Sequence, residues 1–195
     1  SAASDVYKRQ VENYRPGVLA KMGFTAEFLE EINPRLICAS VNGYGSTGPY
    51  VDRPSFDFIA QAMSGFMSVN GSADGDPMRA APHMSDMIAG LYAAFGIVTA
   101  LNARQRTGKG QNVESSLTNG LISMMAYLSA EYLATGEIPK RTGNNHPIAS
   151  PYGLFRASDG RVAVAPSNDV FVERFLQVLN LGYLLDEERL KTNAA

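Results

Sequence analysis

The sequence has few of the features that mark secreted or nucleic-acid-binding proteins. Only one of its 195 residues is cysteine, Cys38, which excludes an internal disulfide framework and a metal site built from several cysteines, and which fits a reducing compartment. Charged residues make up 18% of the chain and the net charge is −2, so no basic excess is available to neutralise nucleic-acid phosphates. We therefore expect no nucleic-acid partner.

Long hydrophobic runs are also absent. The longest uncharged apolar stretch, residues 87–101, has 15 residues, whereas a membrane span requires roughly 18 or more. We interpret this stretch as a buried core helix. The first ten residues, SAASDVYKRQ, lack the continuous apolar segment of a signal peptide. A cytoplasmic location without a membrane partner is the expectation.

Hydrophobic residues form 45% of the chain, and this share, together with the low charge, indicates a folded core. The short apolar run of residues 35–41 predicts a buried strand, and a second short strand is expected around residues 112–114. Residues 152–155 and 162–165 flank a Ser-Asp-Gly turn and predict a β-hairpin. The helical spacing of apolar residues predicts helices at residues 16–32, 56–69, 87–104, 117–134 and 170–179. Strands joined by helix-length connections indicate an α/β fold.

A glycine-rich stretch follows the first predicted strand. Residues 43–48, GYGSTG, match the pattern G-x-G-x-x-G of dinucleotide-binding loops, whose last glycine must lie in a helix. Pro49 and Pro54 oppose such a helix, and the acidic residue expected about 20 positions further on is missing. We therefore interpret this stretch as a loop whose glycines permit tight turns.

The other candidate site residues fit simple roles. Cys38 lies within a predicted strand, where a small buried side chain is expected. His83 and His146 lack the paired spacing of a metal-binding helix, and we expect no metal. His146 lies in a polar loop, where it is either a surface residue or part of a site. The chain has no P-loop and no G-x-S-x-G elbow.

Asp86 is the most informative single residue, because it precedes an almost wholly apolar helical segment. Aspartate at such a position is a preferred N-cap, which accepts hydrogen bonds from the first free amides of the helix. The same position keeps a carboxylate ionised, and an ionised carboxylate can act as a covalent nucleophile toward an activated acyl group. The two roles are compatible.

Three long segments resemble one family. They are residues 11–65 (beginning VENYRPG), 85–117 (beginning SDMIAGLYAAFG) and 143–169 (beginning GNNHPIASPYG). In order and length they are similar to the class III coenzyme A transferases, the group that includes formyl-CoA transferase, carnitine CoA-transferases and the bile-acid-inducible F protein. The resemblance extends over residues 11–195, and it is specific because long ordered segments match.

The resemblance implies a fold and a domain layout. Family members are longer and form interlocked homodimers, in which each subunit has a Rossmann-like large domain and a smaller α+β domain. We expect the chain to be a fragment of this fold. Residues 11–135 are then part of the large, CoA-binding domain, and residues 136–195 are a linker and the start of the small domain. Residues 1–10 do not match the pattern and are interpreted as a leader, either native or a cloning or sequencing artefact.

The nucleophile of the family is the aspartate of a D-x-x-x-G stretch, which falls on Asp86. The resemblance implies that Asp86 attacks the donor acyl-CoA thioester, giving a mixed anhydride and free CoA thiolate. The acceptor carboxylate then exchanges in, and an aspartyl-CoA thioester carries CoA to the new acid. Coenzyme A, as the acyl-CoA substrate, and a carboxylic acid are the implied ligands.

The resemblance also implies contacts to CoA from three short segments. Arg15 and Lys21 suit the phosphates, whereas the ring of Tyr14 or Phe56 suits the adenine or the pantetheine arm. Each of these residues also has an ordinary interpretation as part of a helix start. The full set is Asn13, Tyr14, Arg15, Lys21, Ser55, Phe56 and Asp57.

Two other functions stay open. The sister α-methylacyl-CoA racemases use a histidine base where this chain has Phe56, and phenylalanine cannot remove an α-proton, so transfer is favoured over racemisation. A non-catalytic CoA-binding chain or an inert fragment is the other alternative. The glycine-rich loop that covers the aspartate in formyl-CoA transferase has no clear counterpart after Asn144, so the resemblance does not favour the formyl/oxalyl pair of acids.

Overall fold

The computed structural model describes residues 9–187, and these fall into two units. The first unit contains residues 9–68 and 78–139, and the second contains residues 69–77 and 140–187. The second unit therefore includes a loop that interrupts the first unit in sequence. The assignment of the two units to the large and small domains of the family stays a prediction.

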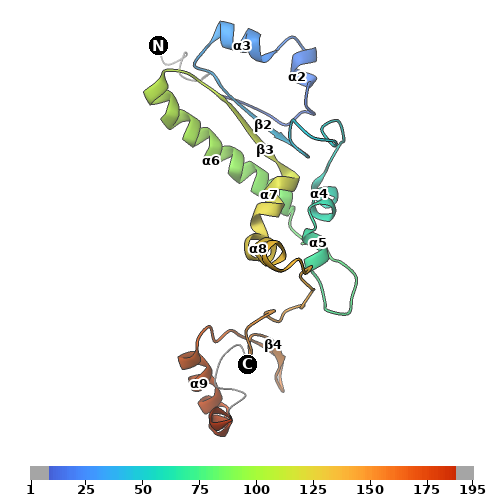
Figure 1. Cartoon of the computed structure of the whole chain (residues 1–195), viewed down its shortest axis with the longest axis vertical. Helices are drawn as coiled ribbons and strands as arrows, with labels where there is room; N and C mark the ends of the chain where they lie inside the picture. The colour runs from blue at the N-terminus through green and yellow to red at the C-terminus, as the bar shows by residue number, and fades with distance from the viewer. Residues whose placement is uncertain (1–8, 188–195) are drawn as a thin grey trace. The chain divides into compact units, whose positions relative to one another are not determined.

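A three-stranded parallel sheet forms the centre of the first unit (Figure 1). The strand order is β1 (Arg9–Glu12), β2 (Ile37–Asn42) and β3 (Asn112–Ser116), with β2 in the middle. In the register, Val11 pairs with Ala39 and Ala39 pairs with Val113. The sequence predicted β2 and β3. It did not predict β1, whose first two residues lie within the segment interpreted as a leader.

Helices make the connections that parallel strands require. Between β1 and β2 lie α2 (Val18–Lys21) and α3 (Ala26–Ile32). The connection from β2 to β3 contains α4 (Asp57–Met63), α5 (Phe66–Val69) and the long α6 (Met84–Thr107), and β3 is followed by α7 (Leu117–Met124) and α8 (Ala126–Thr135). The α/β fold class is confirmed.

Three expected helices are each divided in two. The expected helix at residues 16–32 is broken around Gly23, and the one at residues 56–69 is broken at Gly65; these glycines have φ of 92° and 84°. An α-helix requires negative φ, so each of these conformations ends a helix, and glycine adopts it without a Cβ clash. The third expected helix, residues 117–134, is divided at Met125.

Small residues let α6 lie close to the sheet. Ala89, Ala93 and Ala100 on α6 are buried, as are Ile37 and Ala39 on β2. The same helix lies close to β3 at Gly96, where an added Cβ would be only 2.5 Å from a methyl carbon of Val113. A larger residue at that position would push the helix away from the strand.

The opposite face of α6 is exposed. Four large side chains on it, Met87, Leu91, Phe95 and Val98, each expose between 63% and 70% of their surface, and we call them the α6 stripe. The expectation that residues 87–101 form a buried helix is therefore correct for one face only. By length and composition alone α6 is also the one helix within residues 9–187 that would suit a membrane span, a test that core helices of soluble proteins also pass.

The second unit contains the predicted hairpin and the predicted last helix. Strands β4 (Gly153–Arg156) and β5 (Arg161–Val164) pair antiparallel. Helix α9 (Asp169–Val178) begins after Asn168, whose side chain accepts a hydrogen bond from the amide of Phe171 at 3.0 Å. A short 3-10 helix, η1 (Gly182–Asp186), follows.

Candidate active site

A cavity of about 590 Å³ opens in the first unit. Its walls come from the segments that follow β1 and β2, from the first turns of α6 and from the start of α7. All of these segments lie beyond the carboxyl ends of parallel strands, which is where open α/β sheets bind their ligands. The volume is in the range typical of small-molecule sites.

The cavity brings together six of the eight residues that the resemblance singles out. Residues from three distant parts of the sequence meet here: Asn13, Tyr14, Arg15, Ser55, Phe56 and Asp86. Two residues do not line it. Lys21 is exposed at the end of α2, and Asp57 is buried with its carboxylate bonded inside the protein.

Asp86 lies in the first turn of α6, with 53% of its side chain exposed. The expected N-cap role is wrong, because the helix begins at Met84 and the N-cap is His83, whose side chain makes no capping bond. Instead, Asp57 of α4 satisfies a free amide of this helix end: one oxygen of its carboxylate accepts the amide and the hydroxyl of Ser85, both at 2.9 Å. The carboxylate of Asp86 is thereby left free for the cavity.

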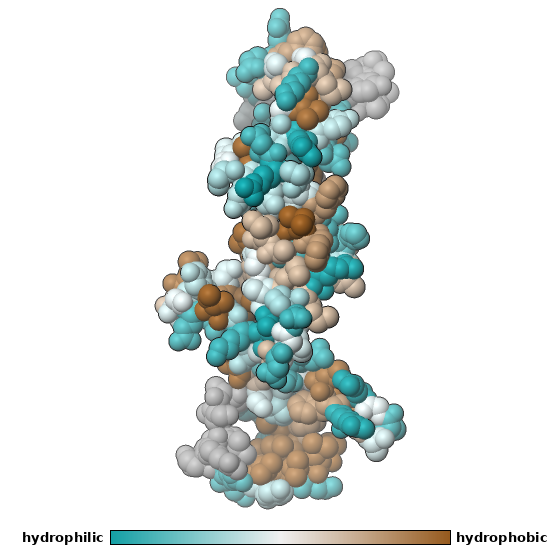
Figure 2. All heavy atoms as spheres, turned by 90° about the vertical axis from the view of Figure 1, so that its right-hand side faces the viewer, coloured by the Kyte–Doolittle hydropathy of each residue, from teal (hydrophilic) through white to brown (hydrophobic). Residues whose placement is uncertain are grey.

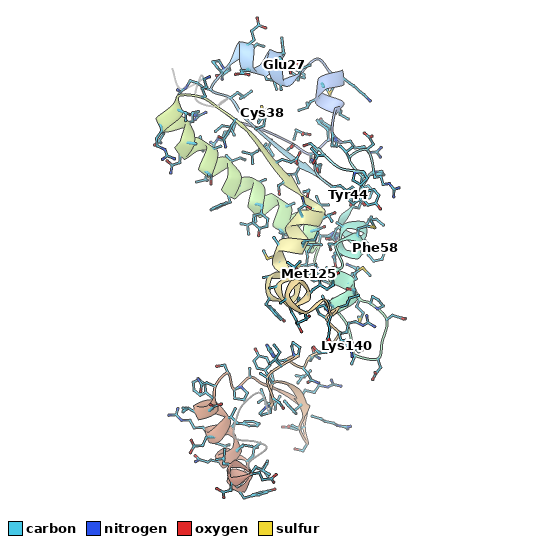
Figure 3. All side chains as sticks on the ribbon, viewed as in Figure 1. Glu27, Cys38, Tyr44, Phe58, Met125 and Lys140 are labelled. Carbon is cyan, nitrogen blue, oxygen red and sulfur yellow. The ribbon has the colours of Figure 1, made fainter. Side chains whose placement is uncertain are left out.

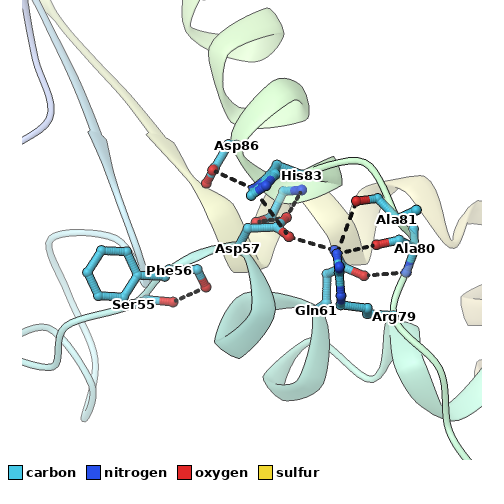
Figure 4. Close-up of polar contacts among 10 residues, drawn as sticks. Ser55, Phe56, Asp57, Gln61, Arg79, Ala80, Ala81, His83 and Asp86 are labelled. Atoms are coloured by element: carbon cyan, nitrogen blue, oxygen red, sulfur yellow. Dashed lines mark hydrogen bonds and ion pairs between the residues drawn. The ribbon is translucent and has the colours of Figure 1, made fainter.

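Asp57 is itself held on its other side (Figure 4). Its second oxygen accepts a hydrogen bond from the side-chain Nε2 of Gln61 at 2.8 Å. The side-chain Oε1 of Gln61 accepts a hydrogen bond from the backbone amide of Ala80, also at 2.8 Å. Asp57, Gln61 and Ser85 are all buried. The network joins α4, the irregular segment before α6 and the first turn of α6, and so fixes the backbone that carries Asp86.

Three influences act on the pKa of Asp86, two of which raise it and one of which lowers it. Burial and the nearby negative charge of Asp57 raise the pKa of the Asp86 carboxyl, whereas His83 lowers it. The nearest approach of His83 is from its Nδ1 to an Asp86 oxygen, at 3.9 Å. A carboxylate with a raised pKa is a stronger base than an ordinary surface aspartate, and it is still ionised near neutral pH when its pKa stays below that range.

Arg53 also lines the cavity, and sequence reasoning missed it. Its guanidinium lies over the ring of Tyr50, 4.4 Å from the centroid, and Tyr50 in turn packs against Tyr44 at a centroid distance of 5.4 Å. Cation–π contact of this kind orients an arginine without neutralising it. Arg15 and Arg53 therefore present two cations to a cavity that also contains the Asp86 carboxylate.

The glycine-rich loop does not form a dinucleotide site. Gly45 and Gly48 have φ of 94° and 93°, and the Asn42 side chain accepts the amide of Gly45 at 2.5 Å. The next helix in the chain after the loop, α4, begins only at Asp57, so the loop does not lead directly into a helix as a dinucleotide-binding loop does. The interpretation as a loop built from tight turns is confirmed.

Of the remaining candidates, Cys38 does not line this cavity and His146 belongs to the second unit. Cys38 is on β2 (Figure 3), and burial, followed by the charge of Glu12, raises the pKa of its thiol. His146 belongs to the second unit, where its Nδ1 accepts the amides of Ile148 and Ala149 at 3.1 and 3.0 Å. Within residues 9–187, no group of three acidic, histidine or cysteine side chains is placed to hold a metal ion.

A parallel sheet with connecting helices, and a cavity at its carboxyl edge lined by a carboxylate and two cations, define an α/β protein with a charged cavity. Residues 2–195 match CoA-transferase family III, and the chain belongs to this family. The resemblance drawn from the sequence is confirmed. The match begins at residue 2, within the segment interpreted as a leader.

Relatives and solved structures agree with this assignment. The chain is 40% identical to the succinate–glutarate CoA-transferase of Agrobacterium fabrum, over 95% of this chain and 46% of that protein. It is 39% identical to the acetyl-CoA:oxalate CoA-transferase of Acetobacter aceti, over 93% of this chain and 47% of that protein. A CaiB/BaiF family protein from Brucella suis superposes with a TM-score of 0.80 at 38% identity, over 96% of this chain and 50% of that protein. The chain spans about half the length of the curated relatives it matches.

Proposed function

We propose that the protein transfers coenzyme A between an acyl-CoA and a carboxylic acid, with Asp86 as the nucleophile. The observation that carries the proposal is the half-exposed Asp86 carboxylate at a cavity that also presents Arg15 and Arg53, in a member of CoA-transferase family III. The anionic phosphates of CoA and the carboxylate of an acceptor both suit the two cations.

The proposed reaction proceeds through acyl groups of similar energy. An Asp86 oxygen bonds to the donor carbonyl carbon while its carbon–sulfur bond breaks, which leaves a mixed anhydride and CoA thiolate. The thiolate attacks the Asp86 carbonyl and releases the donor acid, giving an aspartyl-CoA thioester. The acceptor carboxylate then displaces the thiolate, and the thiolate finally attacks the acceptor carbonyl and restores Asp86.

We propose that at least one of the two acid substrates is a dicarboxylic acid. The first relative described above is named for succinate and glutarate and the second for acetyl-CoA and oxalate, so each name includes at least one acid with two carboxylates. One carboxylate takes part in the exchange, and the other needs a cation in the same cavity, a role that Arg15 or Arg53 can fill.

The test is a transfer assay. The protein is incubated with succinyl-CoA and glutarate, and glutaryl-CoA is measured by chromatography. Asp86→Asn is expected to abolish the product, whereas Asp159→Asn, which changes an exposed aspartate in the hairpin turn, is expected to leave it unchanged. Equal activity of the wild-type and Asp86→Asn proteins would refute the role of Asp86.

A racemase on the same fold is a second candidate, because the structure places a histidine, His83, beside Asp86 although residue 56 is phenylalanine. Solvent deuterium appearing at the α-carbon of a 2-methylacyl-CoA would support it. Calorimetry with CoA distinguishes both enzymes from an inert chain. The cytoplasmic location and the homodimer also stay proposals, and the exposed α6 stripe offers a surface for the homodimer.

A further inference from the structure

One nitrogen of His83 faces two carboxylates at almost the same distance (Figure 4). Its Nδ1 lies 3.9 Å from an oxygen of Asp86 and 4.0 Å from an oxygen of Asp57. These distances are within the range of an ion pair but too long for a direct hydrogen bond, so the contact is electrostatic or passes through a water. A protonated imidazole at this point attracts both carboxylates.

The two carboxylates differ in freedom. Asp57 is buried and held by Ser85 and Gln61, so it is a fixed negative charge. Asp86 is half exposed and lines the cavity. The His83 side chain, 70% exposed, has no capping task in α6, because only its backbone carbonyl is used, by the amide of Met87. Its side chain is therefore available to respond to these two charges.

We propose that His83 is a positioning residue, whose imidazolium keeps the Asp86 carboxylate ionised and held at the cavity while Asp57 anchors the imidazole. The proposal rests on the proposed function, in which Asp86 must be ionised to attack a thioester. Without a counter-charge, the fixed charge of Asp57 would favour the protonated and unreactive form of Asp86. His83 opposes that influence, and its effect lowers the pKa of Asp86.

Other charged groups near this point act elsewhere. Arg79, on the segment before α6, donates from its guanidinium to the carbonyls of Ala80 and Ala81 at 3.1 and 3.0 Å. Arg15 and Arg53 line the cavity on the side of the loops after β1 and β2. The shift in the pKa of Asp86 comes from burial, Asp57 and His83.

The first experiment follows the ionisation of Asp86 directly and needs no activity. The ¹³C signal of the Asp86 carboxyl, identified by its loss in Asp86→Asn, is titrated by NMR in the wild type, His83→Gln and His83→Lys. His83→Gln is expected to move the midpoint to higher pH, because the group that lowers the pKa of Asp86 is then lost. His83→Lys keeps a cation and is expected to keep the midpoint near its wild-type value.

The chain offers a matched control, because it contains only two histidines and the second, His146, lies in the other unit. His146→Gln is expected to leave the Asp86 titration unchanged. An unchanged midpoint in His83→Gln, or the same upward shift in His146→Gln, would overturn the proposal.

The second experiment measures the pH profile of kcat/KM for CoA transfer. His83→Gln is expected to shift the acidic limb to higher pH by the same amount, with little change above neutral pH, and His83→Lys is expected to restore it. An active His83→Gln protein with an unshifted acidic limb would overturn the proposal. A shifted NMR midpoint in a protein without transfer activity would instead contradict the proposed function and leave the coupling of His83 to Asp86 established.

Discussion

Asp57 and Ser85 are 28 positions apart in the sequence, yet one oxygen of the Asp57 carboxylate accepts both the backbone amide and the hydroxyl of Ser85, each at 2.9 Å. Asp57 begins α4 and Ser85 belongs to the first turn of α6. The pair therefore locks two helices together immediately before Asp86. The orientation of the proposed nucleophile depends on a buried contact that it does not itself make.

Loss of this contact is expected to destabilise the protein. Asp57→Ala leaves the Ser85 amide, the Ser85 hydroxyl and the Gln61 amide without their buried acceptor, at a cost of about 2–4 kcal/mol in the free energy of unfolding. Urea unfolding measures the change. Asp52→Ala, at an exposed loop position, is the control. Equal free energies of unfolding for the two variants would show that the Asp57 network does not stabilise the protein.

Removal of the Asp86 charge is expected to stabilise the fold. The folded protein raises the pKa of Asp86 above its ordinary 3.8, so the folded state binds this proton more tightly than the unfolded state does. The ionised group therefore costs stability once the pH rises through the raised pKa. Asp86→Asn should be more stable than the wild type at pH 7, and the difference should shrink toward pH 4. A wild-type protein more stable than Asp86→Asn at pH 7 would contradict the direction of the shift.

Arg53 is expected to bind an anionic part of the substrate. Arg53→Ala should raise the KM for the acyl-CoA about tenfold, which is about 1.4 kcal/mol of binding free energy. Arg53→Lys should have a KM between those of the wild type and Arg53→Ala, because lysine keeps the charge but loses the planar contact with Tyr50. Arg106→Ala, on the exposed end of α6, is the control. Equal KM values for all four proteins would exclude Arg53 from binding.

The α6 stripe is expected to be an interface. Met87, Leu91, Phe95 and Val98 follow one helix face, and such an exposed apolar row marks a contact surface. Figure 2 shows another face, that of α4, where apolar side chains also gather. If a second copy covers the stripe, Phe95→Glu should shift the sedimentation coefficient toward the monomer, whereas Leu133→Glu on α8 should not. No shift with Phe95→Glu would remove the stripe from the interface.

Local sequence patterns predicted the elements that depend on local forces. The hairpin β4–β5, strand β2 and helix α9 follow from turn residues, β-branched runs and helical spacing, all within a few residues. The divisions at Gly23 and Gly65 were missed because apolar spacing continues across them, whereas the positive φ of each glycine interrupts the helix.

Six of the eight residues that the resemblance singles out line the cavity, whereas contacts that depend on three-dimensional packing were missed. Asp86 was expected at the helix start, but its N-cap role was wrong because Asp57 supplies the acceptor from another helix. No local sequence pattern indicates the contact between Asp57 and Ser85. The stacking of Arg53 on Tyr50 could have been suspected from their spacing in a loop, but only the folded loop shows that Arg53 also lines the cavity.

The most direct test of the account is to identify the atom that becomes acylated. The protein is mixed with succinyl-CoA, treated with hydroxylamine to trap activated carboxyl groups, digested and analysed by mass spectrometry. A hydroxamate on Asp86, formed only when acyl-CoA is present and absent from Asp86→Asn, is the predicted result. A hydroxamate on a different residue, with Asp86 unmodified during active turnover, would contradict the assignment of Asp86 as the nucleophile.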